Sequence, residues 1–181
     1  MENKIKNDLR MDKRLRAVFG EIDLGSVTSS PTDTREGILA EQESEEAKQI
    51  KAITTMVSNS PHFKELVPET GLVTTTKEFI SQPDGNRIKI QYIRPDTDEE
   101  LPCVYYIHGG GMMIYSCFDE MYAAWGRCIA RQGVAVAMVD FRNAMWESSA
   151  PEIEPFPAGL NDCVSGLKWV HASAKELNID Q

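Results

Sequence analysis

The sequence lacks a long apolar segment and an excess of positive charge. No stretch approaches the roughly 20 apolar residues of a membrane span, and residues 1–13 alternate charged with polar side chains instead of forming the apolar core of a secretory signal. The chain has 19 basic and 28 acidic residues, and its formal net charge of −9 repels nucleic acid and anionic lipid. We therefore expect a cytoplasmic protein that binds neither nucleic acid nor membranes and whose partner is a neutral small molecule.

Cysteine pairs are also missing. None of the four cysteines has the C-x-x-C spacing of a zinc or redox site, and the reducing compartment expected here disfavours disulfides. The sequence therefore predicts free thiols, two or three of them buried, and no metal or other cofactor. The four residues are Cys103, Cys117, Cys128 and Cys163.

Helical patterns fill the first part of the chain. Apolar side chains at helical spacing predict an amphipathic helix that ends near Gly20 or Gly25. In a second helix, Pro31 suits the first helical position, and Asp33 with Glu36 makes a capping box. The apolar positions are Met11, Leu15, Val18, Phe19 and Ile22 in the first helix and Ile50, Ile53 and Val57 in the second. The acidic cluster Glu41, Glu43, Glu45 and Glu46 is interpreted as a solvated face.

From residue 72 the pattern alternates instead. Leu72–Ile80 and Arg87–Arg94 flank a Pro-Asp-Gly-Asn turn and predict an antiparallel hairpin. Cys103–Ile107 and Val134–Val139 are unbroken apolar runs, typical of strands covered on both faces, and the helical segment Asp119–Gln132 joins them into a β-α-β unit.

A last helix is predicted over Ala158–Leu177. Its inward face is expected to carry Leu160, Val164, Leu167 and Val170. We place a boundary near residue 65, between a helical segment, 1–65, and an α/β body, 66–181.

The most informative residues are His108-Gly109-Gly110-Gly111. They directly follow a predicted strand, where ligands gather in parallel α/β sheets. Three glycines cost backbone entropy, which makes sense where successive N–H groups must turn toward one negative charge. Three interpretations stay open: an oxyanion loop for acyl transfer, which we favour, a plain turn, and a phosphate cradle. The sequence has neither G-x-G-x-x-G nor G-K-[S/T] here, which disfavours the last.

Strand and loop together, Cys103–Gly111, resemble the HGGG oxyanion loop of the hormone-sensitive-lipase-like esterases, a branch of the α/β-hydrolase fold. Val139-Asp140-Phe141-Arg142 is similar to that family's D-[YF]-R motif, and residues 155–170 are similar to its FPA…D…LKWV helix. Two features depart from the family pattern. Asn143–Glu154 forms a different and longer loop, and Met112 stands where an aromatic residue often follows the glycines.

The resemblance implies an incomplete α/β-hydrolase fold: N-terminal cap helices over 1–65, then an antiparallel hairpin and the first parallel strands and helices of the central sheet over 66–181. It assigns the N–H groups of Gly109 and Gly110 to an oxyanion hole, with His108 and Gly111 supporting the loop. It also implies that Asp140 pairs with Arg142.

The catalytic triad that this resemblance implies is missing. The sequence has no G-x-S-x-G elbow for a nucleophilic serine, and the nearest candidate, Ser165, lies inside a predicted helix. The core segment is therefore expected to end before the nucleophile elbow. The other candidates are interpreted as structural or solvated: His62, His108, His171, Asp140 and Asp162.

We expect a serine carboxylesterase of small esters, of which this chain alone is inactive because it supplies only the oxyanion loop. One alternative is a relative that has lost a triad member and binds a small ligand, as do plant hormone receptors that resemble this fold. Another is a half-domain that pairs with a different chain. Cys103–Ile107 is expected to be an open apolar edge through which the chain self-associates.

Overall fold

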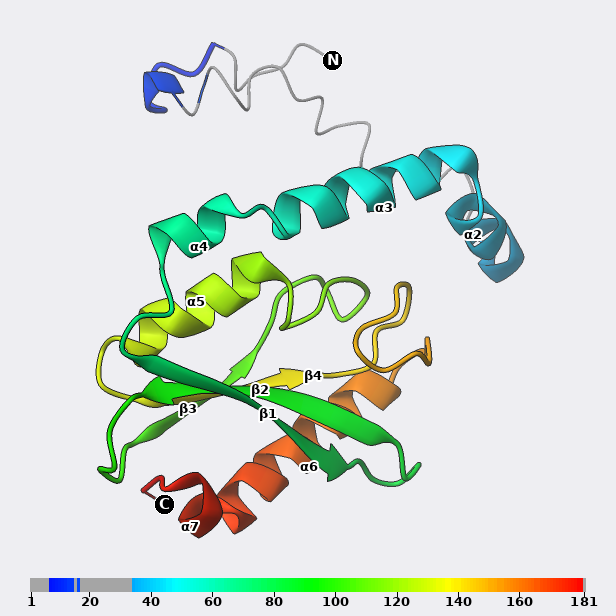
Figure 1. Cartoon of the computed structure of the whole chain (residues 1–181). Coiled ribbons are helices and arrows are strands. Elements are labelled where there is room, and N and C mark those ends of the chain that lie inside the picture. Colours follow the sequence, from blue (N-terminus) through cyan, green and yellow to red (C-terminus); the bar gives the residue numbers. More distant parts are fainter. Residues whose placement is uncertain (1–6, 15, 17–33, 181) are drawn as a thin grey trace. The chain divides into compact units, whose positions relative to one another are not determined.

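The computed structural model describes residues 7–14, 16 and 34–180, which belong to two compact units, Met1–Ile50 and Lys51–Gln181 (Figure 1). Most of the first predicted helix, as well as Pro31 and Asp33, lies outside the described residues. The boundary near residue 65 stays a prediction.

The second predicted helix is in fact two. α2 (Arg35–Gln42) is capped by Thr34, whose side-chain oxygen accepts a hydrogen bond from the Gly37 N–H at 3.2 Å. α3 (Glu45–Ser58) begins at a new cap, because the Ser44 hydroxyl accepts from the Ala47 N–H at 3.1 Å. A short α4 (His62–Leu66) follows. The predicted apolar stripe of α3 faces outward, since Ile50, Ile53 and Val57 are 51%, 59% and 55% exposed.

Both strand predictions are confirmed by a four-stranded mixed sheet with the order β1-β2-β4-β3. β1 (Leu72–Ile80) and β2 (Arg87–Pro95) form the antiparallel hairpin. β3 (Cys103–Ile107) and β4 (Ala135–Asp140) run parallel, and α5 (Glu120–Ala130) connects them. β2 pairs antiparallel with β4, so the hairpin extends the parallel pair.

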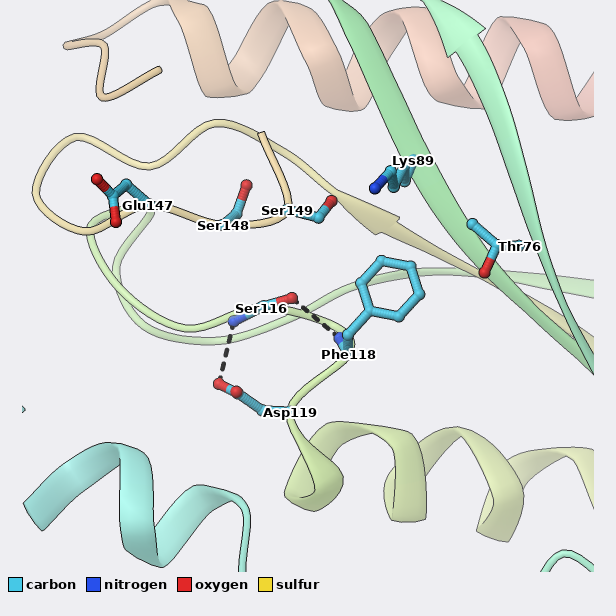
Figure 2. Close-up of a pocket in the computed structure, with 8 residues that line it drawn as sticks. All are labelled: Thr76, Lys89, Ser116, Phe118, Asp119, Glu147, Ser148 and Ser149. Carbon is cyan, nitrogen blue, oxygen red and sulfur yellow. Dashed lines mark hydrogen bonds between the residues drawn. The ribbon is translucent and has the colours of Figure 1, made fainter. Parts of the chain in front are cut away.

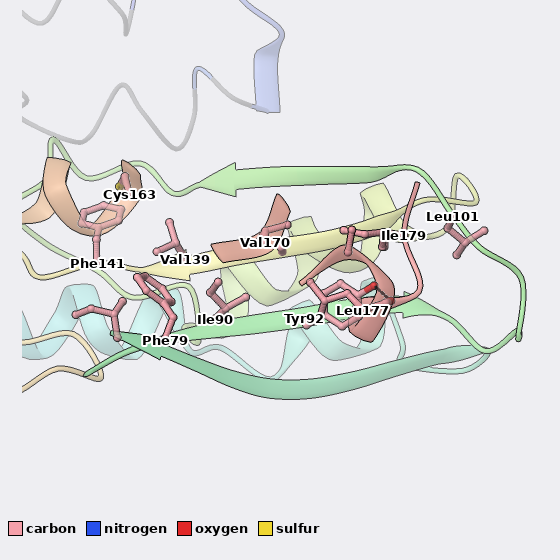
Figure 3. Close-up of a cluster of buried hydrophobic side chains, with 14 of the residues drawn as sticks. Phe79, Ile90, Tyr92, Leu101, Val139, Phe141, Cys163, Val170, Leu177 and Ile179 are labelled. Carbon is pink, nitrogen blue, oxygen red and sulfur yellow. Dashed lines mark hydrogen bonds between the residues drawn. The ribbon is translucent and has the colours of Figure 1, made fainter. Parts of the chain in front are cut away.

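The core lies on both faces of β4, every residue of which is buried. Alternation along β4 sends Val136 and Met138 toward α5, and Ala137 and Val139 toward the opposite face. Figure 3 shows the larger cluster on that opposite face, where strand side chains such as Phe79 meet the C-terminal helices.

The prediction that β3 is covered on both faces is wrong. Val104 and Ile107 are 37% and 48% exposed, because β3 is an edge strand. The sheet order agrees with the expectation of an open edge at Cys103–Ile107, which rested on the family resemblance because periodicity alone does not separate an edge strand from a central one.

The inward face predicted for the last helix is also wrong, except at Val170. In α6 (Ala158–Ala172), Leu160, Val164 and Leu167 are 44%, 43% and 52% exposed. Small residues take the inward face because the helix packs closely on the sheet: a Cβ on Gly166 would overlap the Tyr105 hydroxyl.

After α6, the short α7 (Ala174–Leu177) turns the chain back toward the sheet. Ile179 then forms an isolated parallel bridge with Leu101, just before β3. Of the four cysteines, all are free, and Cys117 and Cys163 are buried, as predicted. No helix in the described part of the chain is long and apolar enough to cross a membrane.

Candidate functional site

The glycine loop turns sharply at the carboxyl end of β3. Gly110 has φ +112° and Gly111 φ +65°, a region that side chains rarely adopt. Gly110 accepts a hydrogen bond from the Met113 N–H at 3.1 Å, and a Cβ on Gly110 would overlap the carbonyl oxygen of Ile114. Two non-glycine residues, Met112 and Tyr115, also have positive φ, at 58° and 77°. The whole turn is therefore held in an unusual backbone shape.

His108 is buried beneath this loop. Its ring stacks on Phe141 with centroids 4.3 Å apart, and its Nδ1 lies 2.8 Å from the Gly109 carbonyl oxygen. Burial lowers the pKa of His108, while the Gly109 carbonyl and the Asp140 carboxylate oppose that shift. A neutral ring that donates from Nδ1 leaves Nε2 as an acceptor, and no residue in the described part of the chain hydrogen-bonds to it.

Asp140 lies at the carboxyl end of β4 and joins two loops. One carboxylate oxygen accepts from the Ser116 hydroxyl at 2.7 Å and the Cys117 N–H at 2.8 Å, and the other accepts from the Ser149 N–H at 2.6 Å. Its nearer oxygen is 4.0 Å from His108 Nε2. The expected pairing of Asp140 with Arg142 is wrong, because these loop donors already use its oxygens.

Arg142 instead pairs with Asp162, and both side chains are buried. Nε and Nη2 of Arg142 each lie 2.9 Å from an oxygen of Asp162, and this pairing raises the pKa of Arg142. Ser81 and Asp84, in the turn of the hairpin, also bind this pair, at 2.5 Å and 2.9 Å. The D-[YF]-R arginine therefore clamps α6 and the hairpin turn against the end of β4.

The remaining candidates are not brought together into a triad. The Ser165 hydroxyl accepts from the Gln82 N–H at 3.0 Å and so contacts the hairpin turn. His62 is exposed and pairs with Glu65 on its own helix. His171 lies in the last turn of α6. Among the described residues, no group of three or more His, Cys, Asp or Glu side chains could hold a metal ion.

The unusual loop 143–154 contacts the glycine loop directly. The Ala144 N–H donates to the Met112 carbonyl at 3.0 Å, and the Trp146 N–H donates to the Met113 carbonyl at 2.9 Å. The ring of Trp146 packs edge-on against Tyr115, with centroids 6.4 Å apart. Lys51, from α3, lies over the Trp146 ring at 5.7 Å. Loop 143–154 therefore helps to hold the turn that contains the three glycines.

Sequence reasoning missed a polar groove of about 410 Å³ beside these loops. Figure 2 shows Lys89 of β2 pointing toward Ser149 across it. The backbone of Lys89 pairs within the sheet, but within the described part of the chain its side-chain ammonium has no hydrogen bond or ion pair. Ser116 and Ser149 line the groove and donate to Asp140, so one carboxylate joins the two segments that form the groove wall. The lining residues are Thr76, Lys89, Ser116, Phe118, Asp119, Glu147, Ser148 and Ser149.

The comparisons identify relatives of this chain. The BD-FAE family model matches residues 90–181. Carboxylesterase NlhH of Mycobacterium tuberculosis is 32% identical over 117 residues, covering 64% of this chain and 33% of that protein. Tabersonine synthase of Catharanthus roseus is 34% identical over 104 residues, covering 57% of this chain and 30% of that protein.

Solved structures match over a longer region. Esterase Est22 superposes with a TM-score of 0.91 and 52% identity, covering 99% of this chain and 52% of that one. Brefeldin A esterase, a bacterial homologue of human hormone-sensitive lipase, superposes with a TM-score of 0.55 and 29% identity, covering 70% of this chain and 37% of that one. The chain thus spans about half the length of the Est22 structure and a third of the curated relatives. It belongs to the BD-FAE family and to the hormone-sensitive-lipase-like esterases of the α/β-hydrolase fold, and it matches their N-terminal portion.

Proposed function

We propose that this chain is the part of a serine carboxylesterase that holds the oxyanion, and that the serine, acid and histidine of the triad lie outside these 181 residues. The observation that carries the proposal is the conformation of Gly110, because its positive φ and its contact with Ile114 exclude any side chain. The loop lies at the carboxyl end of a parallel strand, where α/β proteins bind ligands. The 52% identity to an esterase over 99% of the chain supports the same proposal.

In the proposed reaction the triad serine attacks the ester carbonyl, and the carbonyl oxygen becomes an oxyanion. The N–H groups of Gly109 and Gly110 stabilise the charge on that oxygen. Each such donor contributes roughly 10²–10³-fold to kcat. His108 holds the loop by donating to the Gly109 carbonyl and, being neutral and buried, adds no charge of its own.

The test compares two polypeptides. One is the 181-residue chain, and the other is the same chain fused to the segment of Est22 that it does not match. With a short-chain nitrophenyl ester, we expect turnover only from the fusion. A fluorophosphonate probe should label a serine only in the Est22 segment. Labelling of Ser165, or of any serine in the chain itself, would contradict the proposal.

A second candidate function is non-hydrolytic. One relative, Tabersonine synthase, is named as a synthase rather than an esterase. The natural polypeptide that contains this chain would then carry another residue at the nucleophile position and bind a small molecule without hydrolysing esters. In either case, the missing half of the domain could be supplied by a separate polypeptide that pairs with this chain. Co-purification from the native source would detect such a partner.

A further inference from the structure

Tyr122 lies beside the glycine loop although it comes from the first turn of α5. A Cβ on Gly109 would be 2.9 Å from the Tyr122 hydroxyl oxygen, so the phenol occupies the space that a side chain at position 109 would need. The ring is held from two sides: its centroid is 5.3 Å from that of His108 and 5.7 Å from that of Tyr115. The hydroxyl is therefore fixed against the loop.

The Tyr122 hydroxyl has a proton to donate. Burial raises the pKa of Tyr122, as do the nearby Tyr106, Tyr115 and Asp119, whereas a hydrogen bond from the Gly109 N–H opposes the rise. The phenol therefore stays protonated at neutral pH. No residue in the described ranges accepts a hydrogen bond from it, so its O–H is available to a ligand at the loop.

We propose that the Tyr122 O–H donates to the substrate's carbonyl oxygen beside the Gly110 N–H, and that the Gly109 N–H acts on that oxygen through the phenol. This inference rests on the proposed esterase function. The Gly109 N–H donates to the phenol oxygen, and the phenol O–H donates to the substrate oxygen, so the two bonds polarise each other in the same direction. Tyr122 keeps its proton throughout and forms no covalent bond. Because it touches the reacting oxygen, it is a catalytic residue.

The test uses the natural polypeptide that carries these residues together with its triad. Tyr122→Phe removes one hydroxyl, and Tyr106→Phe is the matched control, because it removes the same atom from the neighbouring strand β3. We expect Tyr122→Phe to lower kcat on the order of 10²-fold with little change in KM. We expect Tyr106→Phe to leave both values near wild type.

A second readout separates donation from packing. Replacing Tyr122 with 3,5-difluorotyrosine lowers the pKa of the phenol without removing it, so the alkaline limb of the kcat profile should move to lower pH. A purely structural role would leave that limb in place, and this variant decides the matter even where Tyr122→Phe folds poorly. An active wild type whose folded Tyr122→Phe variant keeps its kcat would overturn this inference alone. A wild type without esterase activity would overturn the proposed function as well.

Discussion

Arg142 and Asp162 form a buried pair in which two guanidinium nitrogens each lie 2.9 Å from a carboxylate oxygen. Asp162→Asn leaves the guanidinium charge buried without its main partner, so we expect the free energy of unfolding to fall by about 3–5 kcal/mol. Asp84→Asn is the matched control. Asp84 also binds Arg142, but its side chain is 43% exposed, so its loss should cost about 1 kcal/mol or less. Urea unfolding measures the free energy of unfolding of both variants. Equal decreases would contradict the prediction that Asp162 is the main partner of Arg142.

Gly110 and Gly71 both have positive φ but differ in their surroundings. A Cβ on Gly110 would overlap the Ile114 carbonyl oxygen, whereas a Cβ on Gly71 would meet nothing within 4 Å. Gly71→Ala should therefore cost only the backbone strain, about 1–2 kcal/mol, and Gly110→Ala clearly more. Thermal unfolding of the two variants checks this. A Gly110→Ala variant as stable as Gly71→Ala would mean that the loop relaxes easily.

Burial of His108 makes stability depend on pH in a defined direction. Burial lowers the pKa of His108 in the folded chain below the ordinary 6.5. Near and below that pH the unfolded chain therefore binds a proton at His108 more readily than the folded chain does. The stabilisation is therefore fully present above about pH 6.5 and is lost as pH falls below it. We expect the stability difference between wild type and His108→Asn to shrink between pH 7.5 and 5.5. A difference that stays constant over this range would contradict the prediction.

The open side of β3 should promote self-association. Val104 and Ile107 expose apolar surface along an unpaired edge, and the run has no charge and no proline. We expect the 181-residue chain to sediment as dimers or larger species, and Ile107→Lys to shift it toward monomer. Val73→Lys is the matched control, since it adds the same charge to β1 at the opposite, threonine-rich edge. A wild-type chain that is monomeric at all concentrations would show that the edge is not adhesive.

The hairpin and the parallel pair could be predicted from sequence because their patterns are local. Alternation in Arg87–Arg94 and the apolar runs around β3 and β4 are visible without knowing what packs on them. The direction of the α6 side chains was not predictable in the same way. Its buried face is made of small residues such as Gly166, because Tyr105 and Phe79 already fill the space above the sheet.

The glycine loop could be predicted from its sequence motif, but the residues that hold it in place could not. Tyr122, Ser116 and Ser149 reach the loop or Asp140 from segments with no motif of their own. Lys89 carried one visible signal, its place on the polar side of an alternating strand. This position predicts which face of the sheet Lys89 lies on, but it does not predict which loops form the groove around that side chain.

The sheet order also has a consequence for how the chain folds. β1 and β2 are joined by a short turn, whereas β4 pairs with β2 only after the chain has passed through β3 and α5. Closing that long loop costs more chain entropy than closing the hairpin turn, so the β2–β4 pairing forms more slowly. We therefore expect pulsed hydrogen exchange during refolding to protect the β1–β2 amides first. Protection across β2–β4 and β3–β4 should follow later, when β4 pairs with the hairpin on one side and with β3 on the other.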